Sequence, residues 1–562
     1  MSTEVPTPLP IGVSFFDQII EKGYYYADKT LFIKDLLDKK AAVTLCTRPR
    51  RFGKTLNQTM LKCFFENTNE LSGKDTRTLF KGLRIEKAGE KYMEHQGKYP
   101  VIFLSFKEAK KDSFEKSYLQ LKDNIANEFI RHKYVKEKIT DEKRELFEKI
   151  ATGKGSVDEY STSVKFLSEC LEAYYGKKAV ILIDEYDVPL ENSWSRGFYD
   201  KMVDFIRTLL SSALKDNPFL EFSVITGCLR ISKESIFTGL NNLDIISILS
   251  KNYSEHFGFT QDEMDAMLKH YGQESKTQIV KNWYDGYVFG KTEVYNPWSS
   301  VKVVSDWITD IDEWPKPHWA NTSSNDIVRK LINKADNEAK VELETLISGG
   351  SISKTIHEDI TYDEIEKSTD HIWNFLFFTC YLKKVGERSS EEGILTLDLS
   401  VPNTELMYIY KTKINEWFEE STKQRDLKTL FNAVLGGEAE VFQAELSKIL
   451  AESISYHDSA ENFYHGFMAG ILSRLNGYRV KSNRESGDGR SDLVLYGVSI
   501  RDKAVIFELK IAKKAKEMPA VSEEALRQID QKNYAAYWDD EGYKDILKYG
   551  IAFCKKDCEV RK

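Results

Sequence analysis

The stretch that most constrains the fold is residues 41–65, where a phosphate-binding tripeptide separates two different apolar patterns. The stretch begins with AAVTLCT, which is typical of a buried strand, and ends with TLNQTMLKCFF, whose apolar residues recur at helical spacing. Gly53, Lys54 and Thr55 lie at the junction. In phosphate-binding loops this junction presents backbone N–H groups and a helix N-terminus to an anion. The pattern therefore predicts a strand–loop–helix unit that binds nucleotide.

The first half of this loop departs from the usual phosphate-binding sequence. That sequence is Gly, four residues, then Gly-Lys-Ser/Thr, but here Arg48 holds the first Gly position and Pro49, Arg50 and Arg51 follow. The arginines add positive charge that suits a triphosphate, and we take Arg50 as a candidate contact. Taken alone, the tripeptide fits an ordinary loop with a capping threonine equally well.

A second strand supplies the acids that a nucleotide site needs. The segment AVILIDEYDVPL at 179–190 reads as an apolar strand that ends in Asp184 and Glu185. We expect Lys54 to reach the β- and γ-phosphates, and Thr55 and Asp184 to hold Mg²⁺. Glu185 is the candidate to polarise the attacking water. The combination favours an ATP site over a chance tripeptide.

A third segment adds two further candidates. Thr226 ends a strand expected within 219–231 and is suitably placed to sense the γ-phosphate. Arg230 is a candidate to contact a phosphate in cis, or to act as an arginine finger toward a neighbouring copy in a homo-oligomer. The alternative for Arg230 is a surface ion pair.

Strands and helices alternate along the first part of the chain, which predicts an α/β fold with a doubly wound, mostly parallel sheet. We expect this nucleotide-binding domain to span residues 1–255. The region 256–450 reads as mainly helical, and 451–562 reads as a compact α/β domain.

Composition excludes several classes of protein. Of 562 residues, 41% are hydrophobic and 12% aromatic, which is too apolar for a disordered chain. The net charge of −8 means that any nucleic-acid contact must come from local patches. The seven cysteines form no Cys-x-x-Cys pair, so we expect reduced thiols in a cytoplasmic protein. No apolar run is long enough to span a membrane.

Four segments together resemble a known family. YYYADKT, TRPRRFGKTL, ILIDEYD and TGCLRISKESIFTGLNNL are similar to those of the prokaryotic AAA-ATPase-like proteins, which commonly carry a C-terminal PD-(D/E)XK nuclease-like domain. The resemblance spans nearly the whole chain and implies a P-loop NTPase of the AAA/STAND-like kind, in which the arginine-rich loop is the expected form. Tyr25, Tyr26 and Asp28 are then candidates to approach the adenine, although core packing is the favoured role of the tyrosines.

The implied nuclease domain requires a site for a hard cation. Two carboxylates from adjacent strands and a lysine two residues beyond the second form such a site, and oxygen ligands suit Mg²⁺. Asp492, Glu508 and Lys510 fit this arrangement, because Glu508 and Lys510 share one face of a strand. The alternative is an exposed edge pair of Glu508 and Lys510, with Asp492 ending a turn.

Residues on the flanking helices extend this candidate site. Glu461 begins the preceding helix as a further metal ligand, and His465 lies one turn later, where a structural role is favoured. Gln528 resembles the glutamine found on the following helix of many such nucleases. Lys532 and Tyr534 are candidates to contact backbone phosphates.

These features leave three functions open. The first is an ATP-binding, ATP-hydrolysing protein whose C-terminal domain cuts nucleic acid with Mg²⁺, DNA in preference to RNA. The second is a STAND-like switch whose C-terminal domain binds nucleic acid or protein without cleavage. The third is a protein-interaction NTPase with no nucleic-acid partner. The acidic net charge favours the third function, whereas the intact set of Asp492, Glu508 and Lys510 favours the first.

Overall fold

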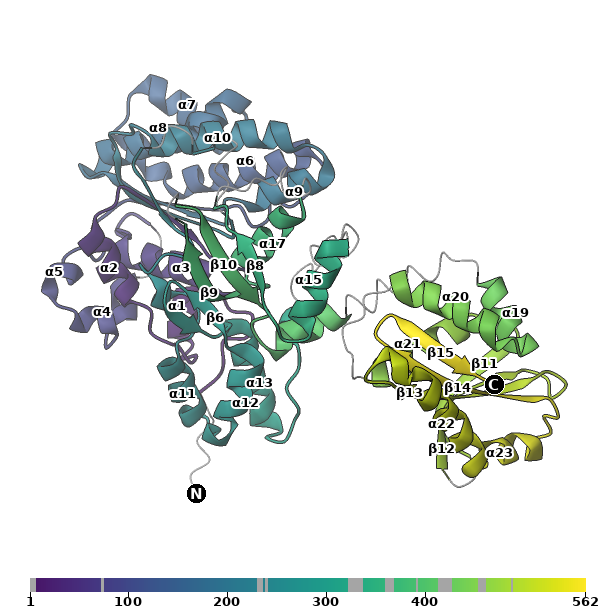
Figure 1. Cartoon of the computed structure of the whole chain (residues 1–562). Helices are drawn as coiled ribbons and strands as arrows, with labels where there is room; N and C mark the ends of the chain where they lie inside the picture. The colour runs from purple at the N-terminus through teal and green to yellow at the C-terminus, as the bar shows by residue number, and fades with distance from the viewer. Residues whose placement is uncertain are drawn as a thin grey trace. The chain divides into compact units, whose positions relative to one another are not determined.

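The computed structural model of the chain divides into two units by its internal contacts (Figure 1). It describes residues 7–71, 75–229, 236–237, 241–321, 337–358, 368–390, 393–412, 427–452, 461–486 and 489–562. The first unit comprises Met1–Ile327 and Ser351–Ile409, and the second comprises Val328–Gly350 and Tyr410–Lys562. The region 256–450, expected to be a separate middle part, is therefore divided between the two units.

A parallel sheet forms the centre of the first unit. Its strand order is β2-β3-β4-β1-β5, and all neighbours run parallel. The strands are β1 (Val43–Thr47), β2 (Val101–Ser105), β3 (Ala179–Asp184), β4 (Leu220–Gly227) and β5 (Leu243–Ile246). Every residue of β1 and β3 is buried, as expected for a sheet covered on both faces. The predicted α/β fold with a doubly wound sheet is confirmed.

Helices cover both faces of this sheet. Figure 1 shows α3 (Lys54–Phe65) on one side and α6 (Phe114–Arg131), α8 (Val157–Tyr175) and α10 (Tyr199–Leu214) on the other. The chain leaves β1 in one direction across the sheet and returns through β2, β3 and β4 in the other, so right-handed crossovers place the connecting helices on opposite faces. The helix α8 begins at a capping box formed by Ser156 and Glu159.

The remaining helices of the first unit surround this core. They are α1 (Phe16–Glu21), α2 (Leu31–Lys39), α4 (Arg84–Lys87), α5 (Glu90–Met93), α7 (Asp141–Ala151), α9 (Val188–Arg196), α11 (Gln261–His270), α12 (Thr277–Tyr284), α13 (Pro297–Thr309) and α17 (Thr369–Phe378). The helix α13 starts at Asn296, whose side chain accepts hydrogen bonds from the N–H groups of Trp298 and Ser299.

The region expected to be mainly helical also contains two small antiparallel sheets. One is the hairpin of β6 (Tyr287–Phe289) and β7 (Thr292–Val294). The other has the order β8-β10-β9, with β8 (Ile352–Thr355), β9 (Lys383–Ser389) and β10 (Leu395–Ser400). The strands β6, β7 and β8 are only three or four residues long, and β9 is rich in polar residues, which weakens their signal in the sequence.

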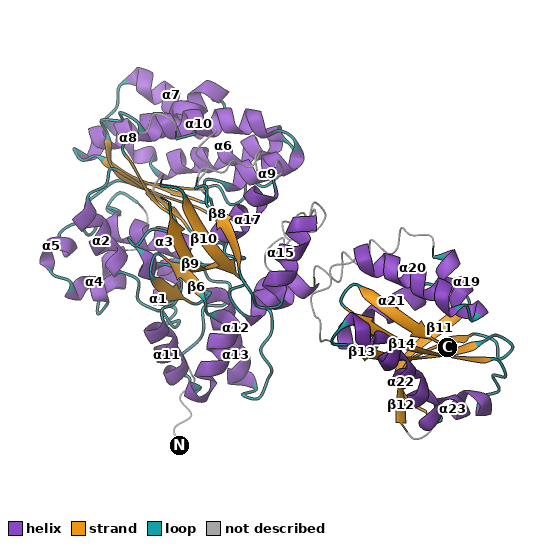
Figure 2. Ribbon diagram, viewed as in Figure 1, coloured by secondary structure: helices purple, strands orange, loops and turns teal. Residues whose placement is uncertain are grey.

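The second unit contains a mixed five-stranded sheet with helices on both faces (Figure 2). Its order is β11-β12-β13-β14-β15, and β13 and β14 are the parallel pair. The strands are β11 (Tyr478–Ser486), β12 (Gly489–Gly497), β13 (Ala504–Ile511), β14 (Ile546–Cys554) and β15 (Asp557–Arg561); the helices are α15 (Asn337–Ile347), α19 (Lys428–Gly436), α20 (Ala439–Glu452), α21 (Glu461–Leu472), α22 (Met518–Gln531) and α23 (Tyr534–Asp540).

Alternate residues of β13 face two different cores in this unit. Val505, Phe507 and Leu509 pack with residues of α19, α20 and α21. Ala504 and Ile506 pack on the other face with residues of α22 and α23. This period of two places Glu508 and Lys510 on the face of α22. Across the described parts of the chain, no helix combines the length and apolar character needed to cross a membrane.

Candidate nucleotide and nuclease sites

The loop between β1 and α3 has the backbone of an anion-binding turn. Arg51 and Gly53 both have left-handed conformations, with φ of 72° and 81°. Such residues turn neighbouring N–H groups into a concavity that binds anions. A Cβ atom added at Gly53 would meet no atom within 4 Å, so the space in front of this glycine is open. The helix α3 begins at the next residue, Lys54, which adds the positive end of its dipole.

Lys54 occupies the middle of this loop. Its ammonium group donates hydrogen bonds to the carbonyl oxygens of Arg48 at 3.0 Å and Pro49 at 2.9 Å, and lies 3.4 Å from Sγ of Cys228. Burial lowers the pKa of Lys54, but the negative groups around it, including Glu185 and Asp184, raise it more, and the net shift is upward. Lys54 is therefore a buried cation with a fixed position.

Asp184 joins three of the predicted site residues. This carboxylate, fully buried at the end of β3, accepts hydrogen bonds from the hydroxyl of Thr55 at 2.8 Å and the hydroxyl of Thr226 at 2.7 Å. Burial raises the pKa of Asp184, and the neighbouring charge of Glu185 raises it further, while both hydroxyls oppose the shift. The strand β4 lies between β1 and β3, which explains how Thr226 reaches this acid.

Glu185 follows Asp184 in a strained conformation. It is half-buried with φ of 54°, a left-handed value that is uncommon for residues other than glycine. Its N–H group lies 3.4 Å from the hydroxyl oxygen of Thr226. Strained residues of this kind cluster at functional sites, where the surrounding structure holds them in place.

Asp187 is a buried acid that the sequence reasoning did not select. Its Oδ2 accepts hydrogen bonds from the N–H groups of Cys228 at 2.7 Å and Leu229 at 3.1 Å, so it fixes the turn that follows β4. Burial raises its pKa to about 6, and the charge of Lys54 opposes that shift. In the sequence, Asp187 could have been selected because it is the third acid of the segment ILIDEYD.

Two arginines of the loop have partners within the protein. The guanidinium of Arg48 is fully buried between the rings of Phe257, at 5.1 Å, and Phe289, at 4.9 Å, and burial lowers its pKa to about 10. Arg48 is therefore a structural anchor, which differs from the expectation that the loop arginines together offer charge to a triphosphate. Arg50 pairs with Glu191 of α9. Arg230 lies outside the described residues.

The N-terminal tyrosines pack against other parts of the first unit. Tyr26 lies edge-on to Phe16, and its hydroxyl oxygen accepts a hydrogen bond from the N–H group of Lys29. Tyr25 lies against His270 and Tyr271. The Asp28 carboxylate accepts hydrogen bonds from the N–H groups of Thr30 at 2.9 Å and Arg84 at 2.7 Å. These contacts agree with the favoured role of the tyrosines in core packing.

The second unit brings two predicted carboxylates onto neighbouring strands. In the antiparallel register of β12 and β13, Leu493 pairs with Phe507, and one further step places Asp492 opposite Glu508. The Asp492 carboxylate accepts a hydrogen bond from the N–H group of Leu509 at 2.8 Å. Glu508 is 4% exposed and accepts a hydrogen bond from the side-chain amide of Gln528 on α22.

Further predicted residues surround these two acids. Lys510 lies 3.3 Å from the carboxylate of Glu524 on α22. Burial raises the pKa of the Tyr534 hydroxyl, and the nearby charges of Glu508 and Asp492 raise it further. Lys532 is exposed at the C-terminal end of α22.

Comparison with known proteins finds a family match for two segments of the chain. Residues 10–237 match the family model described as predicted AAA-ATPase, and residues 459–562 match that of the PD-(D/E)XK nuclease superfamily. The chain combines an AAA-ATPase-like domain with a PD-(D/E)XK nuclease superfamily domain. Together these domains suggest ATP binding and nuclease activity, and they imply a hydrolase.

One relative aligns with nearly all of the chain. The chain is 25% identical over 565 residues to a protein of Azotobacter chroococcum mcd 1 that is described as an uncharacterized protein in the vnfD 5' region. The alignment covers 98% of this chain and 97% of the relative. The two domains and the residues between them are therefore matched as one continuous chain.

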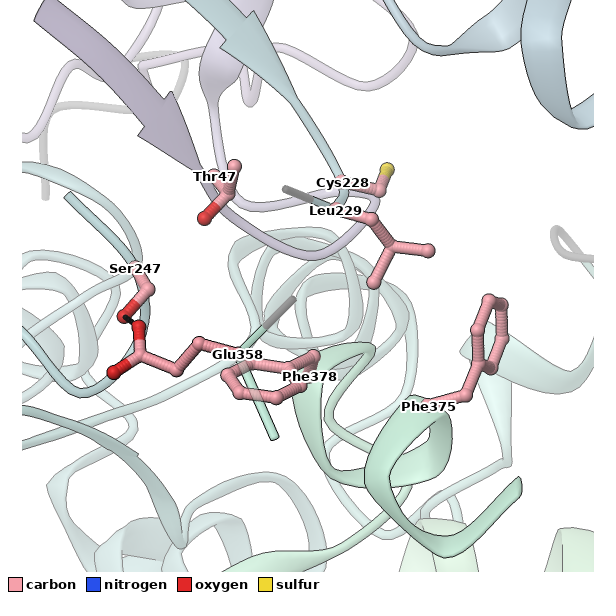
Figure 3. Close-up of a pocket in the computed structure, with 7 residues that line it drawn as sticks. All are labelled: Thr47, Cys228, Leu229, Ser247, Glu358, Phe375 and Phe378. Carbon is pink, nitrogen blue, oxygen red and sulfur yellow. Dashed lines mark hydrogen bonds between the residues drawn. The ribbon is translucent and has the colours of Figure 1, made fainter. Parts of the chain in front are cut away.

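The residues of the AAA-ATPase-like domain suit a magnesium nucleotide. The loop offers N–H groups and the Lys54 ammonium to phosphates, and Thr55 with Asp184 offers hard oxygen atoms to the cation. A small cavity of about 20 Å³ adjoins this site, between Thr47, Cys228, Ser247 and Glu358, with a hydrogen bond from Ser247 to Glu358 (Figure 3). Its volume is about that of one water molecule.

The PD-(D/E)XK domain offers two carboxylates for a cation. Among the described residues, no group of three or more His, Cys, Asp or Glu side chains is arranged to hold a metal ion. Glu461 is the first residue of α21, and its side chain lies outside the described residues. The Nε2 atom of His465 lies 2.9 Å from the carbonyl oxygen of Asp492, a contact that favours the structural role for this histidine. Backbone oxygens and water complete many sites that use two carboxylates.

Proposed function

We propose that the N-terminal domain binds and hydrolyses ATP, and that the C-terminal domain cuts nucleic-acid phosphodiesters with Mg²⁺. The observation that carries the first part is the convergence of Thr55 and Thr226 on Asp184 beside the buried Lys54. The second part is supported by Asp492 and Glu508, which come from adjacent strands with Lys510 two residues further along.

Each residue of the nucleotide site takes a separate role in this proposal. Lys54 leaves the loop carbonyl oxygens to bind the β- and γ-phosphates, and Gly53 allows the close approach of the backbone. Thr55 and Asp184 hold Mg²⁺, which neutralises charge on the phosphates. Glu185 orients the attacking water, and Thr226 keeps Asp184 in position from β4.

The Lys54→Ala variant tests the nucleotide site. We expect at least a tenfold loss of affinity for ATP, because a charged hydrogen-bond donor to phosphate is removed. Binding of a fluorescent ATP analogue with Mg²⁺ measures this loss. Lys81→Ala, which removes an exposed lysine, is the matched control. Equal ATP affinity of Lys54→Ala and the wild type would refute the assignment of the loop.

In the nuclease site, Asp492 and Glu508 are the proposed ligands of Mg²⁺, with Glu461 as a third candidate. The ion would orient the attacking water and stabilise charge on the scissile phosphate. Lys510 positions the nucleophile after it leaves Glu524. Gln528 holds Glu508, and the exposed Lys532 is the candidate contact to the nucleic-acid backbone.

A substrate screen tests the nuclease. The wild-type protein is incubated with single-stranded DNA, double-stranded DNA and RNA, with and without ATP and Mg²⁺. We expect cleavage that requires Mg²⁺, with DNA cut in preference to RNA, and no cleavage by Asp492→Ala. Asp540→Ala removes an exposed acid as the control. Magnesium-dependent cleavage that persists in Asp492→Ala contradicts the assignment.

One observation favours the alternative of a STAND-like switch that does not cleave. Glu508 and Lys510 are each engaged by a side chain of α22, Gln528 and Glu524 respectively. A domain that binds nucleic acid or protein without cutting would keep these contacts. Filter binding in the same screen separates the alternatives: retention of nucleic acid without product supports the switch. The proposed homo-oligomer, in which Arg230 would contact a neighbouring copy, is tested by measuring the molecular mass in solution with and without ATP.

A further inference from the structure

The three arginines of the nucleotide loop differ in their surroundings. Arg48 is enclosed by aromatic rings, and Arg50 pairs with Glu191. Arg51 is exposed, and among the described residues its guanidinium makes neither a hydrogen bond nor an ion pair. Arg51 is therefore the loop arginine that a ligand can engage without breaking an existing ion pair.

Arg51 belongs to the loop that is proposed to bind the triphosphate, between β1 and α3. Arg51 precedes Phe52 and Gly53, so it belongs to the part of the loop that faces the β- and γ-phosphates when Lys54 and Thr55 take their proposed roles. The negative charge of Glu185, the proposed water-orienting residue, acts on Arg51 and raises its pKa, against the larger lowering caused by burial. The charges of Arg51 and Glu185 therefore interact.

A tryptophan supports the guanidinium of Arg51. The guanidinium carbon lies 4.6 Å from the centre of the Trp298 ring, a cation–π contact. The backbone N–H group of Trp298 donates a hydrogen bond to the side chain of Asn296, which caps α13 and fixes the backbone at Trp298. A contact of this kind is weak where it is partly exposed, so a phosphate can replace it.

We propose that Arg51 contacts the terminal phosphate of ATP in cis and leaves Trp298 to do so. This proposal rests on the proposed ATP site and deepens it. In hydrolysis a water oxygen bonds to the terminal phosphorus, and the bridging P–O bond breaks with its electron pair on ADP. The water proton passes through Glu185 to the products. Arg51 donates N–H groups to the charge that spreads over the transferred group, as cis arginines do in other nucleotide hydrolases.

The variant Arg51→Gly tests this role with little risk of misfolding. The φ of 72° at Arg51 favours glycine, so this change relieves strain while removing the guanidinium. We expect an unchanged or higher melting temperature, at least a tenfold weaker binding of a fluorescent ATP analogue, and ADP binding within about twofold of the wild type. ATP turnover should fall by about 10³-fold, the lower end of the effect of arginine fingers. Arg77→Ala, which removes an exposed arginine, is the control.

Tryptophan fluorescence gives a second readout that does not depend on turnover. Binding of ATP, but not of ADP, should change the emission of the wild-type protein as Arg51 leaves Trp298. The change should be absent in Trp298→Phe and in Arg51→Gly, and Arg51→Lys should restore part of the ATP preference because the charge remains.

Two outcomes would overturn the proposal. One is an equal loss of ATP and ADP affinity in Arg51→Gly, which would indicate a structural role for the residue. The other is an ATP-dependent emission change that persists in Trp298→Phe. Failure of the wild-type protein to bind ATP would instead remove the proposed function itself, and the Lys54→Ala measurement distinguishes that result from a failure of Arg51 alone.

Discussion

Two residues from distant parts of the sequence form hydrogen bonds to Asp184. The hydroxyls of Thr55 and Thr226 each donate one hydrogen bond to this fully buried carboxylate. Burial raises the pKa of Asp184, so its charged form is costly in the absence of a cation. The buried negative charge of Asp184 therefore lowers the stability of the folded protein at the position where Mg²⁺ is expected.

Asp184→Asn is the test at this scale. The amide keeps the size of the side chain and removes the buried charge, so we expect a melting temperature equal to or above that of the wild type. ATP hydrolysis should fall by about 100-fold or more, because a ligand of the cation is lost. Differential scanning fluorimetry and a phosphate-release assay measure the two effects. Wild-type turnover in this variant would show that Asp184 does not hold the cation.

The sequence predicted these individual residues better than it predicted their neighbours. Asp184, Thr55 and Thr226 follow from motifs, because parallel strands bring their C-terminal ends to one edge of a sheet. The enclosure of Arg48 by Phe257 and Phe289 was not predictable, since these aromatic residues lie more than two hundred positions away and meet Arg48 only through the tertiary structure. Asp187 was visible as an acid, but its bonds to the turn after β4 depend on tertiary structure.

At the scale of elements, the end of β4 lies so close to the segment after β3 that only the hydrogen atom of a glycine fits at residue 227. A Cβ atom added at Gly227, the last residue of β4, would lie 2.5 Å from the ring of Tyr186 and 2.9 Å from Asp187 Oδ1. The Gly227 carbonyl also accepts a hydrogen bond from the N–H group of Arg48 at 3.0 Å. The end of β4 thus connects the acidic strand to the nucleotide loop.

Gly227→Ala should consequently destabilise the first unit. We expect a loss of roughly 1–3 kcal/mol in the free energy of unfolding, the usual range for overpacking, together with weaker ATP binding. Gly470→Ala is the matched control, because a Cβ atom there meets nothing within 4 Å and the residue lies inside a helix, where alanine is preferred. Chemical denaturation of both variants measures the difference, and equal stability of the two would contradict the close approach.

The buried acid Glu405 links elements outside the parallel sheet through hydrogen bonds. Glu405 accepts hydrogen bonds from the hydroxyl of Ser299 on α13, at 2.9 Å and 3.0 Å to its two oxygens, and from the N–H group of Trp319 at 2.8 Å. Burial raises its pKa from 4.5 to about 8. Trp319, beyond α13, therefore packs against a carboxyl whose protonated form is favoured by burial.

This acid gives the first unit a specific pH dependence. Because the folded pKa of Glu405 lies above the unfolded value, its contribution is fully present below about pH 4.5 and is lost as the pH rises through about 8. Relative to the wild type, Glu405→Gln should be close in stability at pH 5 and more stable by roughly 2 kcal/mol or more at pH 9. Denaturation curves across this range test the expectation, and parallel curves for the two proteins would refute it.

At the scale of the whole molecule, the two units have separate cores and separate proposed ligands. We expect calorimetry to resolve two unfolding transitions, with magnesium ATP raising the temperature of one and Mg²⁺ alone raising the other, because a ligand stabilises the unit that binds it. Gly227→Ala assigns the first transition. Gly550→Ala assigns the second, since its Cβ atom would lie 2.3 Å from the carbonyl oxygen of Ser522. A single transition that both ligands shift would contradict independent units.

The path of the chain between the units has a consequence for biosynthesis. The first unit is interrupted by residues 328–350, which belong to the second, and is completed only by Ser351–Ile409. During translation the first unit therefore cannot complete its structure when residue 327 leaves the ribosome. The helix α15 can pack with the rest of the second unit only after residues beyond 410 have been made. A genetic split anywhere between residues 327 and 410 would separate at least one unit from a segment that belongs to it, so the two units are expected to be expressed as one chain.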